Sequence, residues 1–256
     1  MTSFQSAVHG TLFVTTDDGR FTKVLLFRRG MLDDMHDIDA HALRSLGLER
    51  LAALLAESAA THPHIRRQLQ FECASKKRGD IVTAARRWMR AFREQPSCLD
   101  ARQVRALSEE LDAMRIAISS QVAVDAPDVA ADLMWQFIAL AVSVFECTTE
   151  EGWEISKVFD RACDDVVKLS AHARVAPAVF AAQAVTAIVS DQYGQCQTLI
   201  RAIAKTHSSA AVYAAELQEL IRRLLDRPPE AGDEPNSKRW RYLKCALLEL
   251  ESMRVA

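Results

Sequence analysis

The sequence predicts an all-α protein of stacked antiparallel helix pairs, arranged as in an α-solenoid, with a short N-terminal β-hairpin. The 256 residues include only 8 Gly and 7 Pro, which disfavours turn-rich β architectures. Apolar residues recur at helical spacing from about residue 39 onward. The pattern Ala-Pro-x-Val-x-Ala occurs at 126–131 and again at 176–181, an offset that suits one helical hairpin of a repeat array.

The first thirty residues differ from the rest of the chain. Two runs rich in β-branched and aromatic residues, 11–16 and 21–27, flank the sequence Asp-Asp-Gly-Arg. An Asp-Gly pair between such runs predicts a hairpin. Because an isolated hairpin is only marginally stable in water, we expect it to pack on the helices or on a second copy of the chain. A homo-oligomer formed through the hairpin is therefore one expectation.

The rest of the chain divides by its composition. We assign 1–38 to the hairpin and an acidic linker, 39–226 to a helical repeat domain, 227–237 to a flexible Pro-rich loop and 238–256 to a C-terminal helix. An Asp100–Gln103 capping box and first-turn prolines at 127 and 177 mark helix starts. The expected helices are 41–58, 63–76, 80–94, 100–122, 127–147, 153–173, 177–193, 195–205, 208–226 and 238–254.

Composition narrows the class of protein. Hydrophobic residues make up 49% and charged residues 26%, as in ordinary globular chains, and the net charge of −2 gives no overall signal for nucleic acid or acidic membranes. The apolar run 129–145 is short for a membrane span and lacks basic flanks. A second run, 175–189, contains Pro177, Gln183 and Thr186. We therefore expect two buried helices and no membrane partner. The 6 Cys form no CxxC pair, which predicts buried reduced thiols in a cytoplasmic protein.

Several runs in the helical part share the pattern of one family. They are Leu46-Gly47-x-Glu49-Arg50-Leu51-Ala52-x-Leu54-Leu55, Gln103-Val104-Arg105-Ala106-Leu107, Glu110-Leu111-Asp112 with Arg115, Trp135-x-Phe137-Ile138-x-Leu140-Ala141, Val144-Phe145-Glu146 and Val158-Phe159-x-Arg161-Ala162-Cys163. Through them, residues 42–200 resemble an uncharacterised family of bacterial all-α domains, while the hairpin and the 238–254 helix lie outside. The resemblance implies a helical scaffold and no catalytic or binding residues. Similar helical segments look to accompany SWIM-type zinc fingers, but the chain lacks their CxC signature, so no zinc is implied.

The densest polar cluster lies at residues 33–41. His36-Asp37 is the dyad of HD-type metal phosphohydrolases, and Asp37 and His41 would share a helix face. Such a site needs another upstream His on a helix, whereas the upstream His9 lies beside the hairpin. We therefore interpret the cluster as an acidic linker and helix start, and expect no metal or other cofactor. His62 and His64 have no Cys or acid at ligand spacing and mark an exposed helix start.

Charge is distributed unevenly. Residues 66–105 contain 11 basic and 4 acidic residues in a chain whose net charge is −2. A row of guanidinium groups can bind phosphates or carboxylates, although it can equally pair with acids of the same chain or face solvent. The candidate binding residues are Arg66, Arg67, Lys76, Lys77, Arg86, Arg87, Arg90 and Arg93.

A second basic group lies at the start of the expected last helix, where the helix dipole disfavours cations. An anionic partner would offset this loss of stability. It consists of Lys238, Arg239, Arg241 and Lys244.

The leading hypothesis is a non-enzymatic binding or scaffold protein that presents a helical-repeat surface to a protein or peptide. A nucleic-acid-binding protein that uses the basic helices 66–105 is the alternative. A metal-dependent, HD-like hydrolase that uses His36, Asp37 and His41 is the second alternative.

Overall fold

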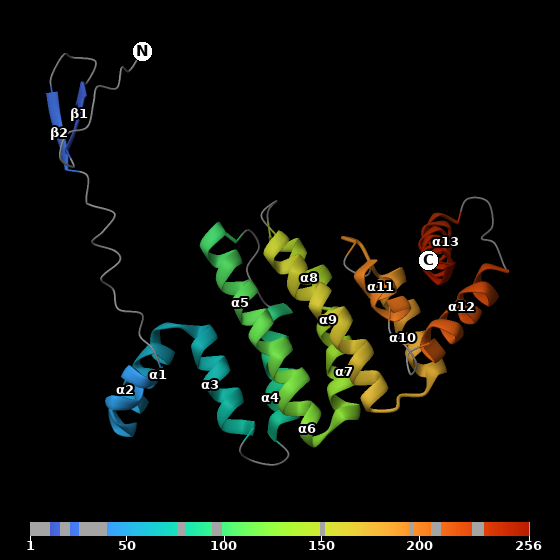
Figure 1. The fold of residues 1–256 in the computed structure, drawn as a ribbon, viewed down its shortest axis with the longest axis horizontal. Helices are drawn as coiled ribbons and strands as arrows, with labels where there is room; N and C mark the ends of the chain where they lie inside the picture. Colours follow the sequence, from blue (N-terminus) through green and yellow to red (C-terminus); the bar gives the residue numbers. More distant parts are fainter. Residues whose placement is uncertain are drawn as a thin grey trace. The chain divides into compact units, whose positions relative to one another are not determined.

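The fold is seen in a computed structural model, which describes residues 11–15, 21–25, 40–75, 80–93, 99–148, 152–194, 197–205, 211–226 and 233–255. The chain forms two compact units, Met1–Glu57 and Ser58–Ala256. The boundary falls inside a helix, whereas composition alone suggested a boundary after residue 38. All described elements from residue 40 onward are helical, which confirms an all-α protein (Figure 1).

The described residues of the first unit form two strands and two helices. Strand β1 (Thr11–Thr15) pairs antiparallel with β2 (Phe21–Leu25), with Thr11 opposite Leu25 and Thr15 opposite Phe21. The helices are α1 (Ala40–Ser45) and α2 (Leu48–Thr61), which continues into the second unit. No residue of α2 is buried. The packing of the hairpin on helices or on a second copy stays a prediction.

The second unit holds the remaining helices. They are α3 (Pro63–Ser75), α4 (Asp80–Arg93), α5 (Ala101–Ala117), the π-helical turn η2 (Ile118–Val122), α6 (Ala123–Asp125), α7 (Pro127–Ile138), α8 (Ala141–Glu146), α9 (Trp153–His172), α10 (Pro177–Val189), α11 (Gln197–Lys205), α12 (Ala211–Leu225) and α13 (Glu234–Val255).

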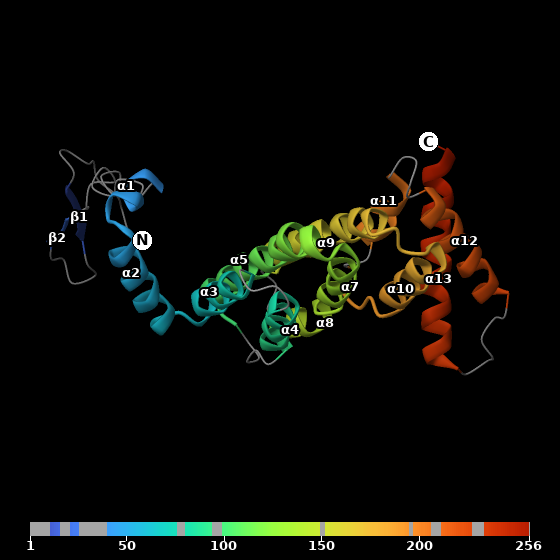
Figure 2. The ribbon, with the colours of Figure 1, turned by 90° about the horizontal axis from the view of Figure 1, so that it is seen from below.

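Helices of the second unit contact one another in two series. In one series α3 contacts α5, α5 contacts α9 and α9 contacts α11; in the other, α4 contacts α7 and α8, and α10 contacts α12. Figure 2 shows the first series following one another from α3 to α11. The long helix α13 packs on α10, α11 and α12. If α5–η2–α6 and α7–α8 are each counted as one helix, each helix from α3 to α10 therefore packs against the next but one along the sequence.

Aromatic residues join these helices in one core. Phe180 of α10 stacks on Tyr213 of α12, with ring centroids 4.3 Å apart. The Phe180 ring also contacts the Trp135 ring of α7 edge to face, with centroids 5.4 Å apart. Phe137 of α7 lies 5.4 Å from Phe159 of α9. Offset and tilted ring pairs add to the free energy gained by burial, so these contacts fix the spacing of successive helices.

The expected helix starts are confirmed where the side chains are described. Asp100 and Gln103 form a reciprocal capping box, in which the Asp100 carboxylate accepts from the Gln103 N–H and the Gln103 amide oxygen accepts from the Asp100 N–H. Pro127 and Pro177 occupy the first turns of α7 and α10, where the missing N–H needs no partner.

Three expected helices are interrupted. The range 41–58 is broken at Gly47, whose φ of +77° is a left-handed conformation that terminates α1. The range 127–147 is broken by a turn at Ala139 and Leu140. The range 100–122 ends in the π-helical turn η2, where the hydroxyls of Ser119 and Ser120 donate to the carbonyl of Ile116.

The predicted C-terminal boundary of the 227–237 loop was wrong, because α13 already begins at Glu234. The carboxylate of Asp233 accepts from the backbone N–H of Asn236 at 3.3 Å, as a helix cap does. Residues 227–232 lie outside the described residues.

Among the described residues, one stretch, Pro127–Glu146, is long and apolar enough to cross a membrane. More than half of it is buried within the second unit, and its Leu133, Met134 and Phe137 are fully enclosed. Core helices have this character.

Candidate functional site

One face of α4 carries only arginine and threonine side chains among its described exposed residues. Ile81, Ala85, Trp88, Met89 and Phe92 are buried on the opposite face. This spacing leaves Thr83 and four arginines exposed: Arg86, Arg87, Arg90 and Arg93. None of the four forms an ion pair with a described residue. We call these four residues the α4 arginine face.

The two α3 arginines that sequence analysis grouped with this face make intramolecular hydrogen bonds. Arg66 donates from Nε and Nη2 to the carbonyls of Ala59 and Ala60, at 2.9 Å each, and so caps the end of α2. Arg67 donates from Nε and Nη2 to the two carboxylate oxygens of Glu110, at 2.6 and 2.8 Å. Lys76 and Lys77 lie outside the described residues.

Glu110 is a buried carboxylate that joins three helices. Its side chain is 6% exposed, and besides the two bonds from Arg67 on α3 it accepts one at 2.8 Å from the indole Nε1 of Trp88 on α4. Charge-assisted bidentate bonds of this kind are strong and directional. Sequence analysis did not single out Glu110 as a buried residue; its position three residues after Leu107, on the same face of α5, was the available signal.

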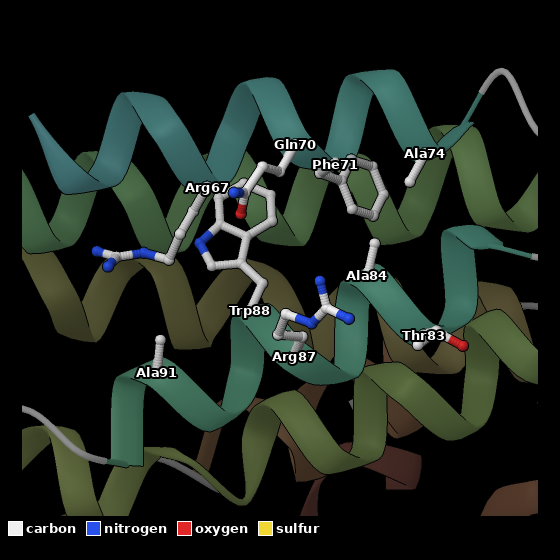
Figure 3. A pocket seen from close by; sticks show the side chains of 9 residues that line it. All are labelled: Arg67, Gln70, Phe71, Ala74, Thr83, Ala84, Arg87, Trp88 and Ala91. Carbon is white, nitrogen blue, oxygen red and sulfur yellow. The ribbon is translucent and has the colours of Figure 1, made fainter. Parts of the chain in front are cut away.

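A pocket of about 300 Å³ lies between α3 and α4 (Figure 3). Phe71 and Trp88 are among its lining residues, with ring centroids 5.6 Å apart, but both are buried, so little of either ring faces the pocket. Its charged lining residues are Arg67 and Arg87, and no acidic residue lines it among the described ones. In Figure 3 the Arg87 guanidinium lies in front of α4, beside Trp88 and Ala84. The α4 arginine face therefore begins at the rim of this pocket.

The second basic group lies on α13. Lys238, Arg239, Arg241 and Lys244 are all exposed. The Nζ atoms of Lys238 and Lys244 lie 5.6 Å and 5.1 Å from the ring centroids of Tyr242 and Trp240. Because α13 begins at Glu234, this basic group starts on the second turn of the helix. The prediction that these cations lie in the first turn, where the helix dipole disfavours them, was therefore wrong.

The candidate metal ligands are not brought together among the described residues. His36 and Asp37 lie outside them, and His41 is exposed on α1. The described part of the chain contains no cluster of three or more His, Cys, Asp or Glu residues that could hold a metal ion. His62 and His64 have ring centroids 5.7 Å apart, and the Nδ1 of His62 bonds with the Thr61 hydroxyl at 2.8 Å.

The expectation that the cysteines are buried is wrong for two of them. Cys73 on α3 and Cys245 on α13 are exposed, whereas Cys163 on α9 is fully buried and Cys147 is half-buried. Cys98 and Cys196 lie outside the described residues.

A larger, mostly apolar groove of about 770 Å³ runs between α7–α8 and α10. Alanines line much of it, and Val179 is 52% exposed. Trp135 also lines it; its indole Nε1 is buried and has no hydrogen-bond partner among the described residues. Asp132 is the one charged residue among the described residues of the lining. Sequence reasoning took α7 and α10 as buried on all sides and so missed this groove.

The pattern of helices can be compared with known proteins. A family of unknown function (DUF6880) matches residues 35–254. The chain belongs to this family. The match covers α1 to α13, so the last helix, which the sequence comparison left outside the resemblance, is part of the DUF6880 pattern. Neither the curated proteins nor the solved structures contain a match to the chain.

Proposed function

We propose that this DUF6880 protein is a non-enzymatic binding protein whose helices stack as an α-solenoid-like array of antiparallel pairs. The two series of helix contacts support the array, as does the recurrence of an Ala-Pro helix start at α7 and α10. Stacked helix pairs give extended surfaces that bind other chains. The groove between α7–α8 and α10 is the single observation that carries the binding function.

The groove fits one amphipathic helix of a protein partner. Its alanines allow close approach of another helix, and its volume of about 770 Å³ accommodates several apolar side chains. The Trp135 side chain adds an aromatic group to this mostly apolar lining.

Charge specifies the partner further. The 13 residues of α10 include no charged side chain, and the charged residues of α7 are Asp128 and Asp132. An occupant with an acidic flank would be repelled, whereas a lysine or arginine beside its apolar face would pair with Asp132. We therefore propose an amphipathic helix with a basic flank.

A display library of helical peptides tests this proposal directly. Peptides selected on the wild-type protein are expected to carry apolar residues at helical spacing with Lys or Arg beside them. Ala182→Trp, which fills the groove, is expected to weaken their binding at least about tenfold, and Asp132→Asn is expected to weaken the basic ones. Ala215→Trp, the same change at an exposed alanine of α12, is the matched control. Binding that survives Ala182→Trp would contradict the proposal.

A second candidate, nucleic-acid binding, is favoured by the α4 arginine face. Its outermost arginines, Arg86 and Arg93, are separated along the helix by about 10 Å, from a rise of roughly 1.5 Å per residue. A polyanion on this face would release counterions and bind less tightly as salt is raised. We expect Arg86→Glu with Arg90→Glu and Arg93→Glu to abolish binding of labelled oligonucleotides with little change in melting temperature.

The charge control for this experiment lies away from α4. Lys168→Glu with Lys205→Glu changes two exposed lysines on α9 and α11 and is compared with Arg86→Glu with Arg90→Glu, which changes charge equally. Equal loss of binding in the two double variants would show general charge attraction rather than a site. No binding by the wild-type protein at low salt would remove this second candidate.

A further inference from the structure

Exposed leucines are concentrated in α1 and α2. Of the eleven large apolar side chains that are exposed in the described part of the chain, four are Leu43, Leu46, Leu48 and Leu55. A concentration of exposed apolar groups in one short stretch marks an interaction surface. We propose that α2 pairs with α2 of a second copy of this chain, as an antiparallel helix pair.

Three leucines of α2 lie on one side of the helix. Leu48, Leu51 and Leu55 are spaced by three and then four residues, which is the spacing of the seam between two paired helices. Leu48 is 84% exposed, Leu55 is 46% exposed and Leu51 is half-buried. Removing these side chains from water provides the driving force for association.

The stripe is complementary to itself. In a twofold-symmetric contact, a residue of one copy meets a second residue of the other copy, and the reverse contact forms as well. An antiparallel α2 pair centred on Ala53 places Leu51 of each copy against Leu55 of the other. Ala52 lies next to this centre on the leucine side, and its small side chain allows the two helices to approach closely.

Charge favours a second copy in the antiparallel direction. Arg50 and Glu57 are exposed and lie two turns apart on the same side of α2, so their midpoint nearly coincides with that of the leucine pair. An antiparallel pair places Arg50 of each copy near Glu57 of the other, whereas a parallel pair places like charges together. This attraction acts over about 10 Å, whatever hydrogen bonds the two groups form within their own chain.

The length of α2 sets the strength that we expect. Its 14 residues span about 21 Å, so the pair buries less surface than a standard protein interface. We therefore expect a dimer that dissociates in the micromolar range.

Sedimentation velocity of the full chain tests the proposal. Between about 1 and 200 µM, the wild-type protein is expected to pass from monomer to dimer. Leu48→Gln with Leu55→Gln is expected to raise the dimer Kd at least about tenfold. Val124→Gln with Leu248→Gln, at exposed apolar residues of α6 and α13, is the matched control and should leave the Kd unchanged. A monomer at every concentration, or a dimer that the two leucine changes do not weaken, would overturn the proposal.

Charge variants test the direction of the pair. Arg50→Glu places two acids together at each end of the contact and is expected to raise the Kd about fivefold or more. Adding Glu57→Arg should restore it, whereas Arg102→Glu, at an exposed arginine of α5, should change it little. A Kd unaffected by Arg50→Glu would overturn the antiparallel arrangement. These variants keep the leucines, so the test holds even if the leucine variant folds poorly.

Discussion

Arg115 of α5 donates a hydrogen bond from Nη1 to the carboxylate of Asp165 on α9, and the two residues lie 50 positions apart. Pro127 and Pro177, at the starts of α7 and α10, have the same separation. The ion-paired residues and the two helix-starting prolines are therefore spaced equally along the chain. Burial lowers the pKa of Arg115, but its hydrogen bonds and charge interactions with Asp112 and Asp165 outweigh burial and raise the pKa above its ordinary value.

Arg115→Met is expected to destabilise the protein by about 2–3 kcal/mol, because it leaves Asp165 partly buried without its partner. The Arg115 side chain is only 12% exposed, so solvent screens this pair weakly. Urea unfolding followed by circular dichroism measures the effect. Arg105→Met is the control: its pair with Glu109 is more than 70% exposed on both sides and should cost under about 0.5 kcal/mol. Equal effects of the two variants would contradict the assignment.

Glu110→Gln is expected to cost about 2 kcal/mol in the free energy of unfolding, since it leaves the Arg67 charge without its buried counter-ion. The amide oxygen can still accept the bond from Trp88, so the fold should be retained. The neighbouring Glu109→Gln changes an exposed acid of the same helix and serves as the reference. A Glu110→Gln protein as stable as the reference would show that the carboxylate charge is unimportant.

Stability is expected to fall at alkaline pH partly through Tyr213. Its hydroxyl donates to the carbonyls of Ser170 and Val175, at 2.9 Å each, and burial raises its pKa above the ordinary value. A pKa that is higher in the folded than in the unfolded state means that the folded protein holds the proton longer. This contribution is complete below a pH of about 10, where free tyrosine ionises, and is lost as pH rises through the folded pKa.

Tyr213→Phe should remove that part of the pH dependence. At neutral pH the variant is expected to be less stable by about 1–2 kcal/mol because two carbonyls lose a donor. The gap between wild type and variant should narrow as the pH is raised from 9 to about 11 in urea titrations. A gap that is constant across this range would show that the Tyr213 hydroxyl does not ionise differently in the folded state.

Thiol labelling should distinguish the cysteines of the native protein. Cys73 and Cys245 are exposed and are expected to react rapidly with a maleimide, whereas the fully buried Cys163 should react only after unfolding in urea. Peptide mapping by mass spectrometry assigns each site. Labelling of Cys163 at the same rate as Cys73 would contradict the burial of α9 against α5 and α7.

Local signals predicted most helix starts, whereas the interruptions inside the expected helices were missed. The Asp100–Gln103 box and the prolines 127 and 177 act within one turn, so sequence alone located them. Gly47 was also a local signal, because glycine after an apolar residue is typical of a helix end. The turn at Ala139 and Leu140 has no such marker, since both residues favour helix.

The candidate site was predictable only in part. The α4 arginines follow from the apolar spacing of the same helix, which leaves them exposed. That Arg67 belongs instead to an internal network depends on Glu110, 43 residues away, and no local pattern pairs the two. The groove beside α10 was missed because an apolar helix in sequence does not reveal which of its sides stays uncovered.

The π-helical turn at Ile118–Val122 bears on how related chains can vary in length. A π turn holds one more residue than the α-helical turn it replaces, and it separates α5 from the short helix that leads into α7. Removing a single residue here would restore the α pitch and leave the downstream helix in nearly the same rotation relative to α5, because the π turn absorbs the extra residue within one turn. Ile118 and Val122, both fully buried, stand at the two ends of this turn, so the core positions on either side would stay in place. Single-residue gaps among DUF6880 sequences should therefore be tolerated at this turn more readily than at a regular turn of α5.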